Sequence, residues 1–290
     1  MIILNEKKYA EKCIKDGDIG ETPHVTLNIL AKYCCHILNF KKRKIVDFLT
    51  QFIESNYPLY SYDRNRWDGY IEKVASNAHK YDLYEIDGVW ITDAELNIIE
   101  EINNVSLEKL AFTLLCLAKL NQLKNDRNNG WVNQDSKEVF SLARVYCSVD
   151  ERFIKFGYLH DLGLLEFPKQ NDNLSHRVTY INDSGKKVLF VSDFRELGYL
   201  YLKYKGYNIT KCKECGILIK NNSSKTRKYC SNCFSNRASA TKTIICKDCG
   251  EEVVVKRNNS RTCRCEKCQK IYNNKVKLKY WKSTHDKKVI

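Results

Sequence analysis

The sequence lacks any long hydrophobic run. A helix that crosses a bilayer needs about 18 consecutive apolar residues, whereas the longest apolar stretch, near residues 110–120, is interrupted by Thr113 and Lys119. The apolar start, Met1 to Leu4, is followed at once by polar and charged residues and is too short for a secretory signal. These absences argue against a membrane or secreted protein, and we expect a soluble protein of the cytoplasm.

The sequence also lacks the common signatures of enzymes. It contains no HExxH, no Walker loop, no GxSxG and no pair of carboxylates in a recognisable frame. Gly185 with the two lysines after it lacks the rest of a phosphate-binding loop. Cys147 and His160 are a conceivable nucleophile and base, but a turn cysteine and a helix-end histidine are more often structural. We therefore expect a protein that is not an enzyme.

The composition is that of a folded protein, and its cysteines are unevenly distributed. In 290 residues, 43% are hydrophobic and 11% aromatic, which argues against a disordered chain and suits two or three domains. Nine of the fourteen cysteines fall in the last 80 residues. In a reducing cytosol such clustered pairs indicate metal ligands rather than disulfides. The scattered ones are expected to be small buried hydrophobes: Cys13, Cys34, Cys35, Cys116 and Cys147.

Charge follows the same division. Residues 211–290 contain 21 Lys+Arg and 6 Asp+Glu, a balance of 21 − 6 = +15. Residues 1–210 contain the other 28 Lys+Arg and 29 Asp+Glu, a balance of −1. The whole positive excess of the chain therefore lies in its cysteine-rich tail.

Two cysteine motifs in the tail predict metal sites. Cys-Lys-Glu-Cys-Gly occupies 212–216, and 14 residues separate Cys215 from the next Cys-x-x-Cys; Cys-Lys-Asp-Cys-Gly occupies 246–250, and 15 residues separate Cys249 from the next. The sulfurs of a Cys-x-x-Cys knuckle converge on one ion, and the glycine permits the tight turn. We expect two structural zinc ions with these ligands: Cys212, Cys215, Cys230 and Cys233; Cys246, Cys249, Cys265 and Cys268. Cys263 is either a substitute for Cys265 or a spare thiol.

Residues 211–270 resemble tandem zinc ribbons, in which two knuckles are joined by a hairpin. Ile217–Ile219 and Val253–Val255 supply strands of the right character. With four thiolates each, neither site keeps the open position of a catalytic zinc. Each ion is expected to contribute on the order of 10 kcal/mol to the folding of its small module.

The remaining chain is predicted to be mainly helical. Apolar spacing predicts helices over 5–15, 25–39, 41–56 and 64–79. Asp87–Gly88 between two alternating runs predicts a local hairpin. Three helices followed by a hairpin would be the order of a winged helix.

Residues 106–182 resemble a winged helix-turn-helix. A helix over 107–124 capped by Ser106 precedes helices over 136–144 and 150–160, and Leu162–Gly163–Leu164–Leu165 leads into a wing with the return strand 177–181. In that family the helix 150–160 enters the major groove, where Arg152 and Lys155 would contact nucleic acid. Its mixed charge equally suits a protein-contact module, and a plain helical core with a hairpin is the alternative.

The expected fold class is mainly α with small β-hairpins (α+β), a winged-helix-like helical part plus two C-terminal zinc ribbons. The expected domains are a helical domain at 1–104, for which a winged helix is one alternative, a winged-helix-like domain with a connecting strand and helix at 105–204, a zinc ribbon at 205–243, and a second ribbon with a basic helix at 244–290.

The cations of the tail suggest a polyanionic partner. Lysines release counterions from phosphates, and aromatic rings can stack on bases; Tyr272, Val276 and Tyr280 form a stripe at i+4 spacing among lysines. The expected partner is nucleic acid, DNA rather than RNA, with an acidic protein surface as competitor. The candidate contacts besides Arg152 and Lys155 are Lys225, Arg227, Lys228, Lys256, Arg257, Arg261, Arg264, Lys270, Lys275, Lys279 and Lys282.

The whole layout resembles winged-helix and zinc-ribbon proteins of phages and prophages of Gram-positive bacteria, chiefly in the stretch 193–199 that leads into Cys212. The resemblance implies a mobile-element origin, a bacterial cytoplasm and a role near DNA as a transcription or replication factor. The alternative is an inhibitor or adaptor of the anti-defence type that docks on a host nucleoprotein complex.

Overall fold

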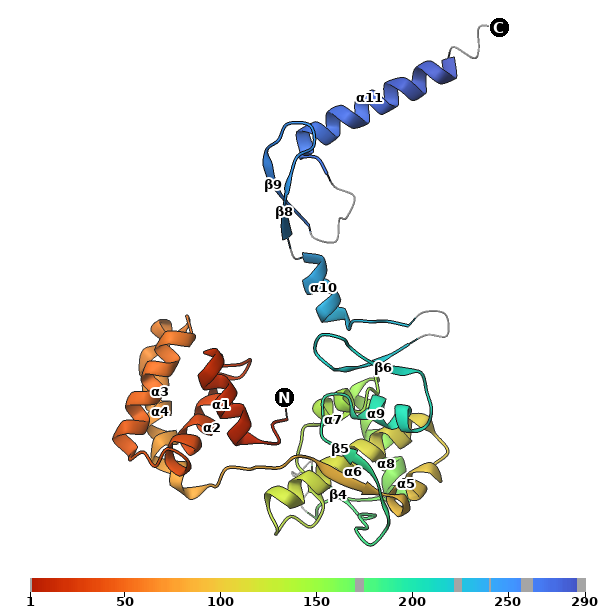
Figure 1. The fold of residues 1–290 in the computed structure, drawn as a ribbon. Helices are drawn as coiled ribbons and strands as arrows, with labels where there is room; N and C mark the ends of the chain where they lie inside the picture. Colours follow the sequence, from red (N-terminus) through yellow and green to blue (C-terminus); the bar gives the residue numbers. More distant parts are fainter. Residues whose placement is uncertain (1, 170–174, 222–225, 240, 257–262, 286–290) are drawn as a thin grey trace. The chain divides into compact units, whose positions relative to one another are not determined.

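The computed structural model describes residues 2–169, 175–221, 226–239, 241–256 and 263–285 (Figure 1). The chain divides into two compact units, Met1–Gly206 and Tyr207–Ile290. Helices make up most of the regular structure, and the strands pair in small antiparallel sheets. The expected class of a mainly α protein with small β elements is confirmed at this level. No helix among these residues is both long and apolar enough to span a membrane.

The first hydrophobic core of unit 1 is built by the N-terminal helices. Its periodic apolar side chains, such as Ile45, Leu49 and Ile53, face inward and are fully or almost fully buried. Cys13 and Cys34 are buried among them, as expected of structural thiols. The elements are α1 (Glu6–Asp16), α2 (Pro23–His36), α3 (Lys42–Asn56) and α4 (Arg64–Asn77), with 3-10 turns at Tyr60–Asp63 and Ala78–Lys80.

The second core of unit 1 surrounds one apolar helix, α6 (Val105–Lys124). Its residues from Leu110 to Leu120 are all buried, because neighbouring elements cover it on every side. The cap is Asn104, whose side chain accepts the amides of Ser106 and Leu107, rather than Ser106 itself. The other elements are β1 (Val89–Thr92), α5 (Asp93–Glu100), β2 (Trp131–Val132), α7 (Ser136–Leu142), α8 (Val149–Asp161), β3 (Leu165–Glu166), β4 (His176–Val178), β5 (Lys187–Val191) and α9 (Leu197–Tyr204).

A small sheet packs beside α6. Its strand order is β2-β4-β3 and both pairings are antiparallel, with Trp131 opposite Arg177 and Leu165 opposite Val178. From α6 to β4 the chain therefore runs helix, strand, helix, helix, strand, strand, and the last two strands flank the segment 167–175. Ser148 caps α8 through a capping box with Glu151.

The local hairpin predicted at Asp87–Gly88 is wrong. β1 pairs instead with β5, with Val89 opposite Val191, a partner about a hundred residues away. A Cβ on Gly88 would lie 2.4 Å from the carbonyl oxygen of Val191, so this glycine is required by a close backbone approach rather than by a turn. The N-terminal helices are therefore not followed by the hairpin of a winged helix, and the second core begins at Val89, before residue 105.

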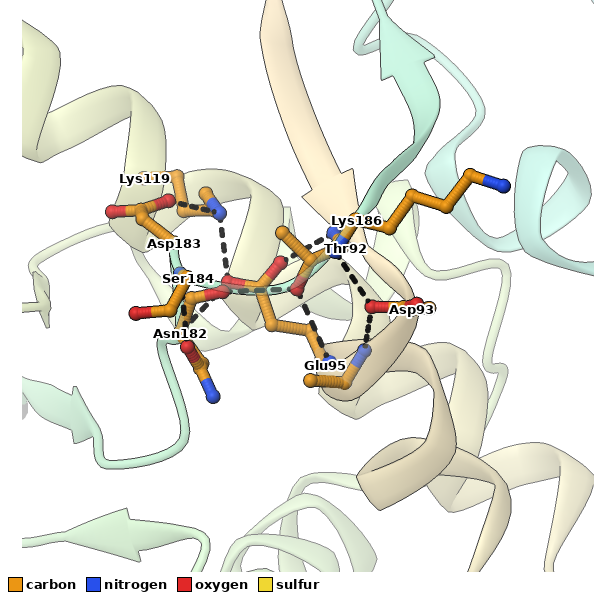
Figure 2. Close-up of polar contacts among 9 residues, drawn as sticks. Thr92, Asp93, Glu95, Lys119, Asn182, Asp183, Ser184 and Lys186 are labelled. Carbon is orange, nitrogen blue, oxygen red and sulfur yellow. Dashed lines mark hydrogen bonds and ion pairs between the residues drawn. The ribbon is translucent and has the colours of Figure 1, made fainter.

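A buried polar network fixes the turn before β5 to the start of α5 (Figure 2). Glu95 is fully buried; its carboxylate accepts the Thr92 amide at 2.8 Å, the Asn182 amide at 3.0 Å and the Lys119 ammonium at 2.7 Å. Lys119 also pairs with Asp183 at 2.7 Å. Because every charged member has a partner, we assign the network to the architecture and not to a site.

Unit 2 consists of two similar modules, each a two-stranded antiparallel hairpin followed by a helix. In the hairpins Thr210 lies opposite Ile219, and Thr243 lies opposite Val254. The first module contains β6 (Ile209–Lys211), β7 (Leu218–Lys220) and α10 (Ser231–Ser239); the second contains β8 (Thr241–Ile245), β9 (Glu252–Lys256) and α11 (Glu266–His285).

Candidate metal centres and the basic surface

The first cysteine cluster joins the tip of a hairpin to the start of a helix. Cys212 and Cys215 lie in the turn between β6 and β7, where Gly216 has a positive φ of 72° and donates its amide to the Cys212 carbonyl at 3.0 Å. Cys230 directly precedes α10, and Cys233 lies in its first turn. The four sulfurs lie within 4.8 Å of one another.

The second cluster repeats this construction contact by contact. Cys246 and Cys249 lie between β8 and β9, and Gly250, at φ 75°, donates to the Cys246 carbonyl at 2.9 Å. Cys265 directly precedes α11, and Cys268 lies in its first turn. These four sulfurs also lie within 4.8 Å of one another.

Both clusters fit a zinc ion. A tetrahedron with metal–sulfur bonds of about 2.3 Å has edges of about 3.8 Å, and the sulfurs of Cys215 and Cys230 are 3.7 Å apart while those of Cys249 and Cys265 are 3.8 Å apart. All the described cysteines are free thiols. The predicted cofactor, two structural zinc ions, is thus confirmed by the geometry, with four thiolates completing each site.

The second cysteine pair of each site differs from the expected zinc ribbon. It lies at a helix N-terminus rather than on a second knuckle. There the helix amides point at the sulfurs: Cys233 N approaches the Cys230 sulfur at 3.5 Å, and Cys268 N approaches that of Cys265 at 3.4 Å. The positive end of the helix dipole therefore lies at this cysteine pair in each module.

Hydrogen bonds also prepare one sulfur of each knuckle for metal binding. The Cys230 amide donates to the Cys212 sulfur at 3.3 Å, and the Cys265 amide donates to that of Cys246 at 3.2 Å. Desolvation opposes ionisation of Cys212, but backbone hydrogen bonds outweigh it and lower the pKa to about 6. Backbone hydrogen bonds, chiefly that from Cys265, lower the pKa of Cys246 to about 6 as well. Within each cluster this is the thiol whose pKa is lowered, whereas hydrogen bonds with neighbouring thiols raise the pKa of Cys233 and of Cys268.

Cys263 occupies a position without a metal-binding role. Its carbonyl accepts the Lys247 amide at 2.8 Å, as the Lys228 carbonyl accepts the Lys213 amide at 3.0 Å in the first module. Cys263 is thus the counterpart of Lys228, and it is exposed. The sequence left either Cys263 or Cys265 as the third ligand, and the structure places Cys265 in the cluster.

An arginine ties the knuckle of the first module to its helix. Arg237 of α10 pairs with Glu214 at 3.6 Å, and its guanidinium lies over the ring of Tyr229, 4.3 Å from the centroid. Glu214 is the third residue of the knuckle, and Tyr229 directly precedes the third ligand. The contact therefore joins the hairpin, the third ligand and the helix.

The second module makes the same contact with the arginine and the tyrosine exchanged. Arg264 pairs with Asp248 at 2.7 Å and lies over the ring of Tyr272, 3.9 Å from the centroid. Here the arginine directly precedes the third ligand, and the tyrosine lies on α11, four residues after Cys268. Arg264, expected to contact nucleic acid, is thus a link between knuckle and helix whose side chain is only 16% exposed.

The structure describes the side chains of only some of the other cations predicted in the tail. Arg227, Lys228, Lys270, Lys275 and Lys279 are exposed, and Lys270 pairs with Glu266 at 3.1 Å. Lys225, Arg257 and Arg261 lie outside the described residues, as do the side chains of Lys256 and Lys282. The candidates taken from the sequence did not include Lys213 and Lys247, which are the exposed second residues of the two knuckles. The Cys-Lys pair that begins both knuckles was the signal that could have identified them.

Arg152 and Lys155 do not lie on the outer face of α8. Both are half-buried at its side, and the Arg152 guanidinium lies 5.9 Å from the centroid of the Phe140 ring. The exposed residues of this helix include large apolar side chains, such as Phe153 and Ile154, together with acidic ones.

The fold and the two sites define a mainly helical protein with two four-thiolate zinc modules in a basic C-terminal unit. No protein-family model matches this chain, and neither a curated protein nor a solved structure matches it.

Proposed function

We propose that the chain is a non-enzymatic nucleic-acid-binding protein in which the zinc modules of residues 207–290 bind the phosphate backbone of DNA. The observation that carries this proposal is the concentration of charge. The balance of +15 over residues 211–290 contrasts with −1 over the rest of the chain. Four thiolates around a zinc ion carry a net charge of −2, so two sites still leave a balance of about +11.

The placement of these charges supports the proposal. α11 is 20 residues long, and all its residues from 271 to 280 are exposed. Lys275, Lys277 and Lys279 therefore stand in water, where an anionic backbone can reach them. Tyr280 is 72% exposed and offers a ring face beside them. The Arg264–Tyr272 contact fixes the start of this helix on the zinc module.

The order of elements in unit 1 supports a winged helix between α6 and β4. Helix, strand, helix, helix, strand and strand, with the sheet order β2-β4-β3, is the arrangement expected of that motif. This assignment, the transcription or replication role and the origin from a phage or prophage are part of the proposal. They rest on the order of elements and on the sequence resemblance.

The proposal is tested by the salt dependence of binding. The zinc-loaded chain is titrated against labelled duplex DNA, single-stranded DNA and RNA by fluorescence anisotropy between 50 and 300 mM salt. If about six phosphates are engaged, the log–log slope for duplex DNA has a magnitude of about 5. A flat response in all three titrations removes the proposal.

Lysine variants locate the interface. Replacing Lys275, Lys277 and Lys279 by glutamine is expected to reduce the magnitude of the slope by about 0.9 per lysine that contacts a phosphate. The matched control replaces Lys12 and Lys73, exposed lysines of unit 1, and leaves the slope unchanged. Equal effects of both sets contradict binding through the tail.

The alternative function, an inhibitor or adaptor on a host nucleoprotein complex, predicts a different outcome. In a pull-down from host lysate with this chain as the bait, one protein would remain bound in stoichiometric amount after nuclease treatment. The affinity of the chain for naked DNA would be weak at every salt concentration. The proposal instead predicts that nuclease treatment leaves the bait without such a partner.

A further inference from the structure

The two zinc modules are repeats of one unit, and the structure shows which of their residues correspond. Residues 208–221 correspond to 242–255, and residues 228–239 correspond to 263–274 after one extra residue in the second module. The metal ligands and the turn glycines of the two modules coincide in this alignment. In both modules the amide of the first ligand donates to the carbonyl five residues later, at 2.8 Å. The modules can therefore be compared position by position.

The modules have few identical residues in these aligned ranges. The identities are the cysteine ligands, Gly216 with Gly250, and Lys213 with Lys247. The zinc ions require the cysteines, and the positive φ favours the glycines. The acidic residue after each lysine keeps its charge and pairs with an arginine of its own module. Lys213 and Lys247, which we call the knuckle lysines, are thus the identical pair for which neither the metal nor the fold gives a reason.

The side chains of the knuckle lysines have no role inside their modules. Both are exposed, and among the described residues neither ammonium group has a hydrogen bond or an ion pair. Each lysine contributes its backbone amide, which donates to the carbonyl two residues before the third ligand, at 3.0 Å from Lys213 and 2.8 Å from Lys247. Neither has a positive φ. Any residue with a backbone amide would therefore serve the fold equally well.

Other exposed lysines of the first hairpin have no counterpart in the second. Lys211 and Lys220 are exposed, and they correspond to Ile245 and Val254. These two aliphatic side chains are 68% and 66% exposed. Exposed positions of the hairpins thus accept either a charge or an aliphatic group. Lysine at the same exposed position of both knuckles therefore indicates a contact that both modules make.

We propose that Lys213 and Lys247 are equivalent phosphate contacts, one in each zinc module, through which unit 2 binds nucleic acid as a tandem repeat. This inference rests on the proposed function and names the residues that the two modules use in the same way. The shared hydrogen bonds hold the backbone of both lysines in the same orientation relative to their metal sites, so the two side chains leave their modules at equivalent places. A lysine ammonium is a point charge with three donors, which suits a phosphate oxygen.

The surroundings of the first knuckle lysine favour an anion. Lys213 is bonded through its amide to the carbonyl of Lys228, and Thr210 donates its hydroxyl to the carbonyl of Arg227 at 3.3 Å. These bonds hold two further exposed cations beside the knuckle. In the second module Cys263 takes the place of Lys228. The neighbours thus add attraction in the first module, while the contact common to both modules is the knuckle lysine.

A competing role for these lysines is to balance the charge of the metal sites. A zinc ion with four thiolates carries a net charge of −2, and an ammonium group beside it would be attracted. Water and salt screen an exposed charge, so this attraction contributes little at the surface of the module. The two roles differ in what a substitution changes: the rate of zinc release in one case, and the salt dependence of binding in the other.

The test measures the salt dependence of binding for the full zinc-loaded chain and its variants. Each protein is titrated against labelled duplex DNA, single-stranded DNA and RNA between 50 and 300 mM salt. Lys213→Gln and Lys247→Gln should each reduce the magnitude of the log–log slope by about 0.9 for a duplex or about 0.7 for a single strand, and the double variant by about twice as much. Lys213→Arg should keep the natural slope, because arginine also contacts phosphate. The matched controls Lys211→Gln and Lys220→Gln should leave the slope unchanged.

Zinc content and the rate of zinc release to a chelator are measured on the same proteins, and both should be unchanged. If the natural chain has a steep slope that neither knuckle variant reduces, this inference fails and the proposed function stands. An equal reduction by the control pair also overturns it, since the attraction would then be diffuse. Faster zinc release without a change of slope overturns it as well and assigns the lysines to the metal sites. A flat response of the natural chain to salt with all three nucleic acids removes the proposed function and this inference together.

Discussion

Burial of His176 makes the stability of unit 1 depend on pH. His176 lies in β4 and is 9% exposed, with its ring centroid 4.0 Å from that of Phe156 and 5.5 Å from that of Phe167. Desolvation lowers its pKa from 6.5 to about 4. Within the described residues its Nδ1 is buried without a hydrogen-bond partner. The folded protein therefore holds the imidazole neutral.

The direction of the effect follows from proton linkage. Because the folded pKa is the lower one, the unfolded chain binds the proton first as the pH falls below about 6.5. The stability is thus fully present above about pH 6.5 and declines toward pH 4. The gap between the two pKa values corresponds to about 3 kcal/mol at its limit, of which about 2 kcal/mol is lost between pH 7.5 and pH 5.

Urea unfolding of the full chain at pH 7.5 and pH 5, followed by circular dichroism, measures this loss. His176→Phe keeps a ring against Phe156 and cannot be protonated, so its stability should fall by about 2 kcal/mol less than that of the natural chain. His79→Gln, at an exposed histidine, is expected to behave like the natural chain. Acid sensitivity of the zinc sites is common to all three proteins, so it cancels when their losses of stability between the two pH values are compared. An identical pH response of the natural chain and His176→Phe refutes the reasoning.

Three further outcomes are expected. Cys265→Ser should lower bound zinc from two equivalents to one, whereas Cys263→Ser should retain both; metal analysis of the purified proteins compares them. Gly88→Ala should destabilise unit 1 by about 1–3 kcal/mol in urea unfolding, because its methyl group meets a backbone carbonyl; an unchanged midpoint contradicts the assigned close approach. Arg264→Tyr and Tyr272→Arg should each accelerate zinc release to a chelator, while the double exchange, which copies the first module, restores the natural rate; a double variant as fast as the singles rules out the shared contact.

Local patterns were enough to predict most helices and all eight metal ligands. The stripe at Ile45, Leu49 and Phe52 is set by helix periodicity alone, and a Cys-x-x-Cys pair converges on one ion whatever surrounds it. These features depend on residues a few positions apart. The sequence therefore already contains the whole of the information that they need.

Features that depend on distant parts of the chain were not predictable in this way. Asp87–Gly88 carries the local signal of a turn, but its glycine serves a pairing with a strand near residue 190. The outer face of α8 depends on which side packs into the core: Phe156 is buried there while Phe153 is exposed, and spacing alone does not distinguish the two. The helix that begins directly after Cys230 was likewise not predicted, because a knuckle and a helix N-terminus share the same cysteine spacing.

Unit 2 shows why the metal sites and the proposed function belong together. Among its described residues the buried aliphatic side chains are those of Ile209 and Ile219, and the other buried apolar residues are the ligands Cys212, Cys246 and Cys265. Two aliphatic side chains contribute only a few kcal/mol, far less than the conformational entropy lost by the two modules. Zinc binding must supply the difference, because a structural site contributes about 10–16 kcal/mol. A unit whose core is metal can leave nearly all its other side chains exposed, which is what the proposed contact between its lysines and a polyanion requires.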